Sequence, residues 1–298
     1  MMIRSISFEF FPPKTPKLEA KLWQSIERLA PIGPKFISVT YGAGGTTRTA
    51  THKIVKNIIN DTELNAAAHL TCVAATKDEV DSVIDNYKSI GVNHIVALRG
   101  DMPDMRSFQP HPNGYSSSVN LVEAIKQHGC FDVTVSAYPE KHPESSSFET
   151  DINLLKAKID AGADQAITQF AFDTDVHASF RDKITACGIN VPLIPGIMPT
   201  TNFKGVQRMA EKCGTSIPDW LTSQYIGLEE DLERRQEIAI NVVVDQCRGL
   251  ISEGFDRLHF YTLNQYKIIG EACHILGLGA GNGLEKEDLT VPSNRETS

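Results

Sequence analysis

Residues 6–13 read Ile-Ser-Phe-Glu-Phe-Phe-Pro-Pro, an apolar strand that carries one carboxylate, Glu9, and ends at two prolines. A strand buried on both faces of a parallel sheet is typically a continuous apolar run. Pro12 and Pro13 end the strand, because proline has a fixed φ and no backbone N–H. A doubly wound sheet would normally have a glycine-rich turn at this place. The two prolines therefore favour a barrel, and the doubly wound sheet is the alternative.

Strand-like runs and helix-like patterns alternate along the rest of the chain. The predicted strands are Ile6–Phe11, Phe36–Tyr41, Ala66–Val73, His94–Arg99, Val133–Tyr138, Ala166–Phe172, Leu193–Met198 and Leu258–Leu263. Between them apolar residues recur at helical spacing, as Val80, Ile84 and Tyr87 do. Strand–helix units that continue along the whole chain predict an α/β fold, a (β/α)8 TIM barrel.

The interval before the last strand is longer than the others. It contains a polar segment, Ser216–Gly227, and then a long helix pattern, Glu229–Ser252, which predicts an extra helix before the eighth strand. Since no linker or change of composition divides the chain, residues 1–278 are predicted to form a single catalytic barrel domain. Residues 279–298 are polar and rich in Gly, Glu, Asn and Ser, which predicts a mobile C-terminal tail.

Composition excludes several classes of partner. The net charge of −8 argues against a nucleic-acid-binding surface. The six cysteines are scattered, with no C-x-x-C pair, so we expect reduced thiols in a cytoplasmic protein without a metal site. No apolar run approaches the roughly 20 residues of a membrane helix, and no signal-peptide pattern is present. We therefore expect neither nucleic acid nor membrane as a partner.

Glu9 is the first candidate functional residue. Burial of a carboxylate raises its pKa and produces a general acid, although pairing with a buried Lys or Arg is the alternative. In a barrel the active site lies at the C-terminal ends of the strands. The polar residues at or just past the predicted strand ends are Glu9, Thr40, Tyr41, His69, Thr71, Arg99, Gly100, Asp101, Tyr138, Glu140, His142, Gln169, Tyr261, Thr262 and Asn264.

Other motifs have two interpretations each. Arg99 could bind a phosphate or carboxylate, or it could pair with Asp101 to close a loop. The loop of residues 42–47 could hold a phosphate with its N–H groups, or it could simply be flexible. His69 is interpreted as a core or cofactor-contact histidine rather than a metal ligand. Asp151 and Lys158 share one helix face, which could equally be a solvated face.

Several of these motifs occur in one order along the chain. They are Phe8-Glu9-Phe10-Phe11-Pro12-Pro13, Ser38-Val39-Thr40-Tyr41-Gly42, His69-Leu70-Thr71-Cys72, Leu98-Arg99-Gly100-Asp101, Ala137-Tyr138-Pro139-Glu140 with His142-Pro143, Ile167-Thr168-Gln169-Phe170, Pro195-Gly196-Ile197 and His259-Phe260-Tyr261-Thr262-Leu263-Asn264. Together they resemble the bacterial methylenetetrahydrofolate reductases, FAD-dependent barrel enzymes, from Ser7 to about Leu278.

The resemblance implies an oxidoreductase that interconverts 5,10-methylenetetrahydrofolate and 5-methyltetrahydrofolate by ping-pong hydride transfer through noncovalent FAD. NADH or NADPH is the possible co-substrate, the pathway is methionine biosynthesis, and a homo-oligomer is expected. Glu9 would be the general acid, and Asp101 would hold the pterin and tune the flavin. The implied substrate contacts are Glu9, Asp101 and Gln169. The implied flavin contacts are Thr40, Tyr41, Ala43, His69, Arg99, Gly100, Asp101, Tyr115, Ser116, Tyr138, His142, Asp151 and Lys158.

The chain departs from the family pattern at the edge of the implied site. Gly205 and Met209 stand where the family has a glutamine and a phenylalanine that contact folate or nicotinamide. Gln265 stands where an arginine would meet the folate tail, and Leu154 and Ala157 occupy two helix positions that contact the flavin. These departures predict weak or altered use of nicotinamide.

Two other functions are compatible with a barrel of this kind. One is a flavoenzyme of the proline-dehydrogenase type, and Glu9 argues against it because amine oxidation needs no acid at that position. The other is a folate-binding protein without turnover. The presence of Glu9, Asp101 and Gln169 together argues against the second.

Overall fold

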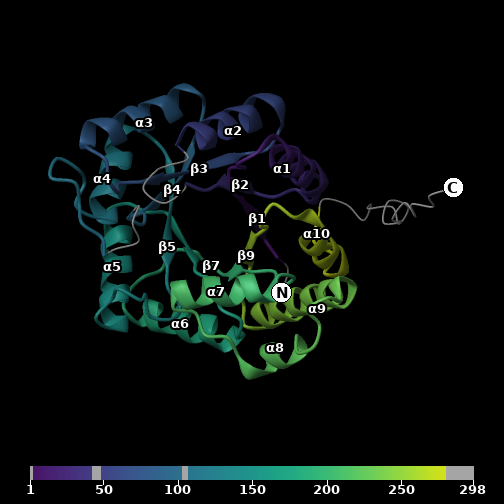
Figure 1. Cartoon of the computed structure of the whole chain (residues 1–298). Helices are drawn as coiled ribbons and strands as arrows, with labels where there is room; N and C mark the ends of the chain where they lie inside the picture. The colour runs from purple at the N-terminus through teal and green to yellow at the C-terminus, as the bar shows by residue number, and fades with distance from the viewer. Residues whose placement is uncertain (1–2, 42–47, 103–106, 280–298) are drawn as a thin grey trace.

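The computed structural model describes residues 3–41, 48–102 and 107–279, and parallel strands surrounded by helices form its centre (Figure 1). Within these ranges nine strands make one sheet, in the order β7-β6-β5-β4-β3-β2-β1-β9-β8. All the strand pairs are parallel. The strands are β1 (Ser5–Phe10), β2 (Phe36–Val39), β3 (Ala66–Thr71), β4 (His94–Leu98), β5 (Asp132–Ala137), β6 (Gln165–Thr168), β7 (Leu193–Ile194), β8 (Gly196–Ile197) and β9 (Arg257–Tyr261).

The predicted seventh strand, Leu193–Met198, is interrupted at Pro195. Its first half, β7, pairs with β6, whereas its second half, β8, pairs with β9. Pro195 cannot donate a ladder hydrogen bond, but its carbonyl accepts one from the His259 N–H at 2.9 Å. One short stretch of chain therefore joins the two ends of the sheet and closes the ring. The predicted (β/α)8 barrel is confirmed, with its seventh strand in two pieces.

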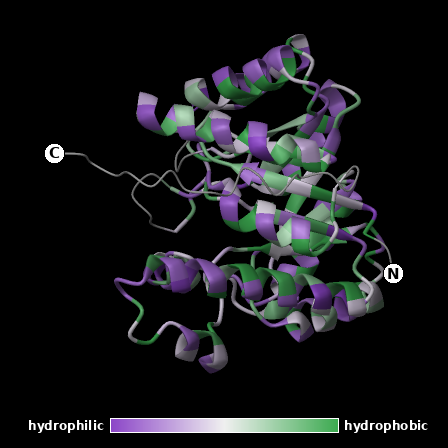
Figure 2. Cartoon of the chain, turned by 90° about the vertical axis from the view of Figure 1, so that its right-hand side faces the viewer, coloured by the Kyte–Doolittle hydropathy of each residue, from purple (hydrophilic) through white to green (hydrophobic). Residues whose placement is uncertain are grey.

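Helices cover the outside of the strands, and hydrophobic and hydrophilic residues alternate along them, as expected for helices with one buried face (Figure 2). They are α1 (Pro16–Leu29), α2 (Arg48–Asp61), α3 (Lys77–Ser89), α4 (Ser118–His128), α5 (Phe148–Asp160), α6 (Thr174–Ala186), α7 (Phe203–Cys213), α8 (Asp219–Gln224), α9 (Leu232–Ser252) and α10 (Tyr266–Ile275), with a 3-10 turn, η1 (Ala30–Ile32). No helix within the described ranges is long and apolar enough to cross a membrane.

The expected additional helical segment before the last strand is present, and packing shows which helix is additional. The predicted helix at Glu229–Ser252 is α9, and it packs in the outer ring against α6 and α10. Its buried residues include Val242, Val243 and Leu250, so it has the apolar face that a ring position requires. The additional helices are therefore α7 and α8, which lie between β8 and α9. The segment Ser216–Gly227, interpreted as polar only, contains α8.

The alternation of side chains along the strands separates a polar interior from an apolar shell. On β1, Phe8 and Phe10 are fully buried in the apolar shell of strands and helices. Glu9, one position away, points to the other face and lines a cavity. Below this cavity the barrel interior is filled by a small apolar cluster of Phe36, Ala67, Val96, Ile167 and Ile194.

Candidate active site

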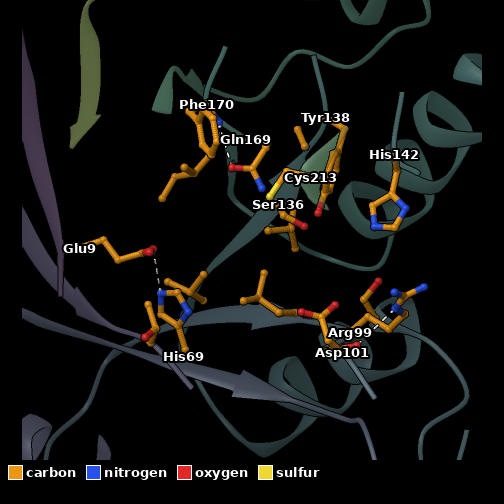
Figure 3. A pocket seen from close by; sticks show the side chains of 18 of the residues that line it. Glu9, His69, Arg99, Asp101, Ser136, Tyr138, His142, Gln169, Phe170 and Cys213 are labelled. Atoms are coloured by element: carbon orange, nitrogen blue, oxygen red, sulfur yellow. Dashed lines mark hydrogen bonds and ion pairs between the residues drawn. The ribbon is translucent and has the colours of Figure 1, made fainter. Parts of the chain in front are cut away.

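A cavity of about 480 Å³ opens at the C-terminal ends of the strands. Figure 3 shows side chains from several strands and the loops after them pointing into this common space. The cavity brings together the majority of the residues predicted from the sequence. Those that line it are Glu9, Thr40, Tyr41, His69, Arg99, Gly100, Asp101, Tyr138, His142, Asp151, Lys158, Gln169 and Tyr261.

Three predicted flavin contacts do not line the described cavity. Tyr115 donates its hydroxyl to Asp81 of α3 at 2.6 Å, and Ser116 donates to Asn120 of α4 at 2.7 Å. Both side chains are therefore engaged with the outer helices. Ala43, with the rest of the loop 42–47, lies outside the described residues. A contact between these residues and a flavin stays a prediction.

Glu9 lies between two histidines from neighbouring strands. Its Oε2 is 3.4 Å from His69 Nε2 and 3.6 Å from His259 Nε2. The Glu9 side chain is 19% exposed, whereas the side chain of His259 is fully buried. On its other side, the Nδ1 atom of His259 is 2.7 Å from the Ser7 hydroxyl. The carboxylate is thus the cavity end of a buried polar row that starts at Ser7.

The pKa of Glu9 differs from the sequence-based expectation. Burial pushes this pKa upward, but hydrogen bonds and charge from His259 and His69 outweigh burial and lower the pKa to about 2. The prediction of a raised pKa is therefore wrong for the protein without ligands. The alternative of pairing with a buried Lys or Arg is wrong too, because the partners are histidines.

The loop after β4 presents Arg99, Gly100 and Asp101 to the cavity. The Arg99 guanidinium pairs with Glu144 at 2.5 Å and lies 4.9 Å from the centre of the Phe108 ring. The ion-pair partner of Arg99 is therefore Glu144. The alternative interpretation of the sequence was that Arg99 pairs with Asp101. Gly100 has a φ of +85°, and a Cβ atom there would lie 2.5 Å from the Val73 side chain. The turn that positions Arg99 and Asp101 therefore requires glycine.

Lys158 of α5 points inward, not into solvent. Its ammonium group donates to the Ser136 carbonyl at the end of β5. Burial lowers the Lys158 pKa to about 8, and nearby Asp151 opposes that shift. Asp151 accepts hydrogen bonds from the His142 N–H and the Ser145 hydroxyl. Since Lys158 is buried against the cavity, the alternative of a solvated helix face is wrong for this residue.

The opposite wall comes from β6, β9 and α7. The Gln169 side-chain oxygen accepts from the Phe170 N–H at 3.0 Å. The Tyr261 hydroxyl donates to the Thr168 carbonyl at 2.9 Å, and burial raises its pKa well above the usual value. Two residues of α7, Met209 and Cys213, also line the cavity. The inserted helix thus forms part of the mouth.

The departures from the family pattern fall in different places. Met209 and Leu154 line the cavity, so two of the substitutions alter its wall. Gly205 lies in the first turn of α7, where a Cβ atom would be 2.7 Å from the Asn202 amide that caps the helix. Gln265 lines a neighbouring groove instead.

His259 is the residue that sequence reasoning missed. It begins the motif His259-Phe260-Tyr261-Thr262-Leu263-Asn264, and no functional role is predicted for it from the sequence. Strand periodicity could have identified it, because residues two apart on a strand face the same side. Tyr261 was placed at the site, so His259 faces the barrel interior as well. The parallel register then puts His259 beside Ser7, two residues before Glu9.

The donor set of the cavity fits an anionic dinucleotide better than a metal ion. Arg99 and the buried Lys158 offer two cations on one wall, and Val96, Leu98 and Ile167 offer apolar surface below them. Lys158 in particular is a buried charge facing a cavity, which an anion would compensate. Within the described ranges, no group of three or more His, Cys, Asp or Glu residues could hold a metal ion.

Comparisons with known proteins show the family of the chain. A family model described as methylenetetrahydrofolate reductase matches residues 3–277. The chain is 45% identical over 277 residues to the 5,10-methylenetetrahydrofolate reductase of Escherichia coli (strain K12), covering 93% of this chain and 92% of the relative. It is 44% identical over 274 residues to the enzyme of the same name from Pectobacterium carotovorum subsp. carotovorum, covering 92% and 90%.

A solved structure extends the comparison to the fold. An uncharacterized protein from Clostridium thermocellum, which binds two copies of 5-methyl-5,6,7,8-tetrahydrofolic acid, matches with a TM-score of 0.60. The match covers 91% of this chain and 94% of that one at 14% identity, so it supports the barrel fold alone. The family match along residues 3–277 and the curated relatives decide the classification: the chain belongs to the methylenetetrahydrofolate reductase family of oxidoreductases.

Proposed function

We propose that the protein interconverts 5,10-methylenetetrahydrofolate and 5-methyltetrahydrofolate with noncovalently bound FAD. The observation that carries the proposal is the position of Glu9, which shares a cavity with Arg99, Asp101 and Lys158 and contacts two histidines. A proton source, a polar wall for a pterin and a cationic wall for a diphosphate thus open onto one space. The names of the curated relatives support the same reaction.

Residues of the β4, β5 and α5 wall are proposed to hold the FAD. Arg99 and Lys158 supply positive charge for its phosphates, and His142 and Asp151 line the same wall. The apolar side chains Val96 and Leu98 offer surface to a flat ring. When bound, FAD supplies the acceptor and donor of hydride for the two half-reactions.

Glu9 is proposed to pass a proton to the folate. Because its pKa is about 2, the Glu9 carboxyl is ionised at neutral pH, so Glu9 has to take up a proton before it can deliver one. Transfer through Glu9 to the bridging nitrogen of methylenetetrahydrofolate breaks the C–N bond of that nitrogen and leaves an iminium carbon that accepts hydride. Asp101 and Gln169 are proposed to hold the pterin during this step.

Nicotinamide and folate are proposed to use the same side of the cavity in turn. Glu9 and Gln169 line one and the same cavity, so the two substrates would alternate there and follow ping-pong kinetics. Met209 gives the mouth a flexible, apolar side chain in place of an aromatic ring. We therefore propose weak or altered nicotinamide use.

The first test is the Glu9→Gln variant. We expect it to bind FAD as the wild type does and to keep flavin reduction by NADH or NADPH. The half-reaction with methyltetrahydrofolate should fall by about 100-fold or more, the usual contribution of a general acid. Both half-reactions can be followed anaerobically by flavin absorbance in a stopped-flow instrument.

Three outcomes would contradict the proposal. A colourless protein that cannot be reconstituted with FAD would remove the flavin. Equal loss of both half-reactions in Glu9→Gln would remove the specific role of Glu9. Tight folate binding without oxidation or reduction in the wild type would favour a folate-binding protein without turnover.

A further inference from the structure

The active-site cavity carries a negative charge of its own, although two cations line it. Among the described residues that line it, the cations are Arg99 and Lys158, and the carboxylates are Glu9, Asp101, Glu144 and Asp151. With the histidines counted as neutral, two positive and four negative side chains give the cavity a formal net charge of −2. The diphosphate of a dinucleotide is therefore attracted only where a neighbouring carboxylate does not already neutralise the cation.

Glu144 is the carboxylate that neutralises Arg99. It lies on the loop between β5 and α5, and its Oε2 atom is 2.5 Å from Arg99 Nη1. The two side chains are 36% and 29% exposed, so water reaches the ion pair. The Nε atom of Arg99 donates to the Gly100 carbonyl at 3.4 Å, and the guanidinium lies 4.9 Å from the centre of the Phe108 ring. An incoming anion therefore meets a guanidinium that already has partners.

Asp151, the carboxylate next to the second cation of the cavity, is held differently. It accepts hydrogen bonds from the His142 N–H at 2.8 Å and from the Ser145 hydroxyl, so it is part of the framework of the loop. The Glu144 carboxylate, within the described ranges, bonds to the guanidinium alone. Glu144 can therefore leave its partner without breaking any other bond of its carboxylate to the described chain.

The backbone around Glu144 is fixed independently of its side chain. The Glu144 N–H donates to His142 Nδ1 at 3.0 Å, and the Ser145 N–H donates to the His142 carbonyl at 2.9 Å. The Lys141 ammonium donates to the Ser145 carbonyl at 2.7 Å. Partly exposed side chains change rotamer rapidly. Rotation of the Glu144 side chain is therefore enough to free Arg99, and the loop keeps its shape.

We propose that Glu144 competes with a phosphate of FAD for Arg99 and so lowers the affinity of the protein for FAD. This inference rests on the proposed function and adds to it a residue that opposes cofactor binding. Two anions at one guanidinium repel each other, so the Glu144 carboxylate has to turn away before a phosphate takes its place. A partly exposed ion pair is weak enough to exchange, and arginine binds a phosphate through two parallel hydrogen bonds.

The test measures the dissociation constant of FAD after the flavin has been removed from the protein and titrated back. The test variant is Glu144→Gln, which keeps the size of the side chain and removes its charge. The control variant is Glu140→Gln, which removes the same charge from the same loop. The Glu140 carboxylate accepts from the Ser216 N–H at 3.0 Å and does not line the cavity. Quenching of flavin fluorescence measures binding independently of turnover.

We expect Glu144→Gln to bind FAD about fivefold more tightly than the wild type, as the loss of one competing ion pair would provide, and the control to bind it as the wild type does. Added salt should weaken FAD binding to Glu144→Gln more than to the wild type, because only the wild type has to break an ion pair that salt also weakens. In an Arg99→Gln background Glu144→Gln should give a smaller gain, because the guanidinium is gone.

Each other outcome has one meaning. Weaker FAD binding by Glu144→Gln would show that Glu144 orients Arg99 for the cofactor, and unchanged binding would show no competition, so either result would overturn the inference. An equal gain in the control, or an undiminished gain in the Arg99→Gln background, would overturn it too, because overall charge would then be the cause. All these results leave the proposed function intact. Failure of the wild type to bind FAD would instead contradict the proposed function, and the inference with it.

Discussion

The charge on Glu9 shows why burial alone does not determine the pKa of an active-site carboxyl. Burial by itself would have made this carboxyl an acid near neutral pH. Two histidines within 3.6 Å reverse the direction, so the carboxyl stays ionised at neutral pH. The role of Glu9 therefore depends on His69 and His259 as much as on the carboxyl itself.

Lys158 gives a prediction at the residue scale. Burial of Lys158 costs free energy, because its charged ammonium group has lost contact with water. Lys158→Met should therefore leave the unfolding free energy of the FAD-free protein unchanged or raise it. The same change should weaken FAD binding by about tenfold, because a charge-assisted contact is lost. Urea unfolding and FAD titration measure the two effects. Lys156→Met is the control, because Lys156 lies on the same helix and is exposed.

The pH dependence of that variant has a definite sign. The pKa of Lys158 is about 8 in the folded protein and about 10.5 in an unfolded chain. The wild-type unfolding free energy should therefore fall as the pH drops from about 10.5 to 8 and level off below 8. Lys158→Met should remove this contribution. Weakened folding of the variant together with unchanged FAD affinity would contradict both statements.

At the element scale, α7 is expected to govern how the protein uses nicotinamide. The helix contributes Met209 to the cavity mouth. An aromatic ring there would stack on a flat ligand more strongly than a thioether can, so Met209→Phe should speed flavin reduction by NADH or NADPH several-fold. The matched control is Met198→Phe, on the loop after β8, which lines the same cavity from another side.

Stopped-flow measurement of flavin reduction decides this prediction. Fast reduction of the wild-type flavin, with no gain in Met209→Phe, would contradict it. Restoring a glutamine at position 205 is not an equivalent experiment. A Cβ atom at Gly205 would lie 2.7 Å from the Asn202 amide, so the change would disturb the start of α7 as well as the mouth.

The elements also show what the sequence could and could not predict. Apolar runs and helical spacing were sufficient for the barrel, because each unit has to bury one face. The break at Pro195 could not be located, because the halves on either side contain two residues each, too few for periodicity to register. α8 was missed for a similar reason, since it spans 6 residues and has one buried side chain, Leu221.

The part of the site that is built from residues at the strand ends could be predicted from the sequence. Glu9, Arg99 and Gln169 meet because the C-terminal ends of parallel strands share one rim. The sequence could not show that Tyr115 bonds to Asp81, because a loop side chain is free to turn toward either neighbour. The direction of the Glu9 pKa also required the distances to His69 and His259.

On the scale of the whole molecule, buried histidines should make the fold sensitive to acid. Burial lowers the pKa values of His94 and His177 to about 4, from about 6.5 in an unfolded chain. Above pH 6.5 these histidines do not reduce the unfolding free energy. As the pH falls from 6.5 toward 4 the unfolding free energy declines, because only the unfolded chain takes up the protons. Each histidine should cost up to about 3 kcal/mol over this interval.

Urea unfolding at a series of pH values checks the expectation. The unfolding free energy of the wild type should decline between pH 6.5 and 4, and His177→Gln should show a shallower decline, because one titrating group is gone. An equal slope in the two proteins would show that His177 does not contribute. His111→Gln is a matched control, since this histidine lies in an outer loop.

The interrupted seventh strand has a dynamic consequence for the barrel. The ring is closed by two pieces of two residues each, supported by the Gly196 N–H bond to the Thr168 hydroxyl at 2.9 Å. Because so few ladder hydrogen bonds hold this joint, the free energy needed to open the barrel should be lowest here. Tyr261, which lines the cavity, donates its hydroxyl to the Thr168 carbonyl across the same joint. A ligand packed on Tyr261 would hold the two sides of this joint together. Amide hydrogen exchange along β8 should therefore become slower when the ligand binds.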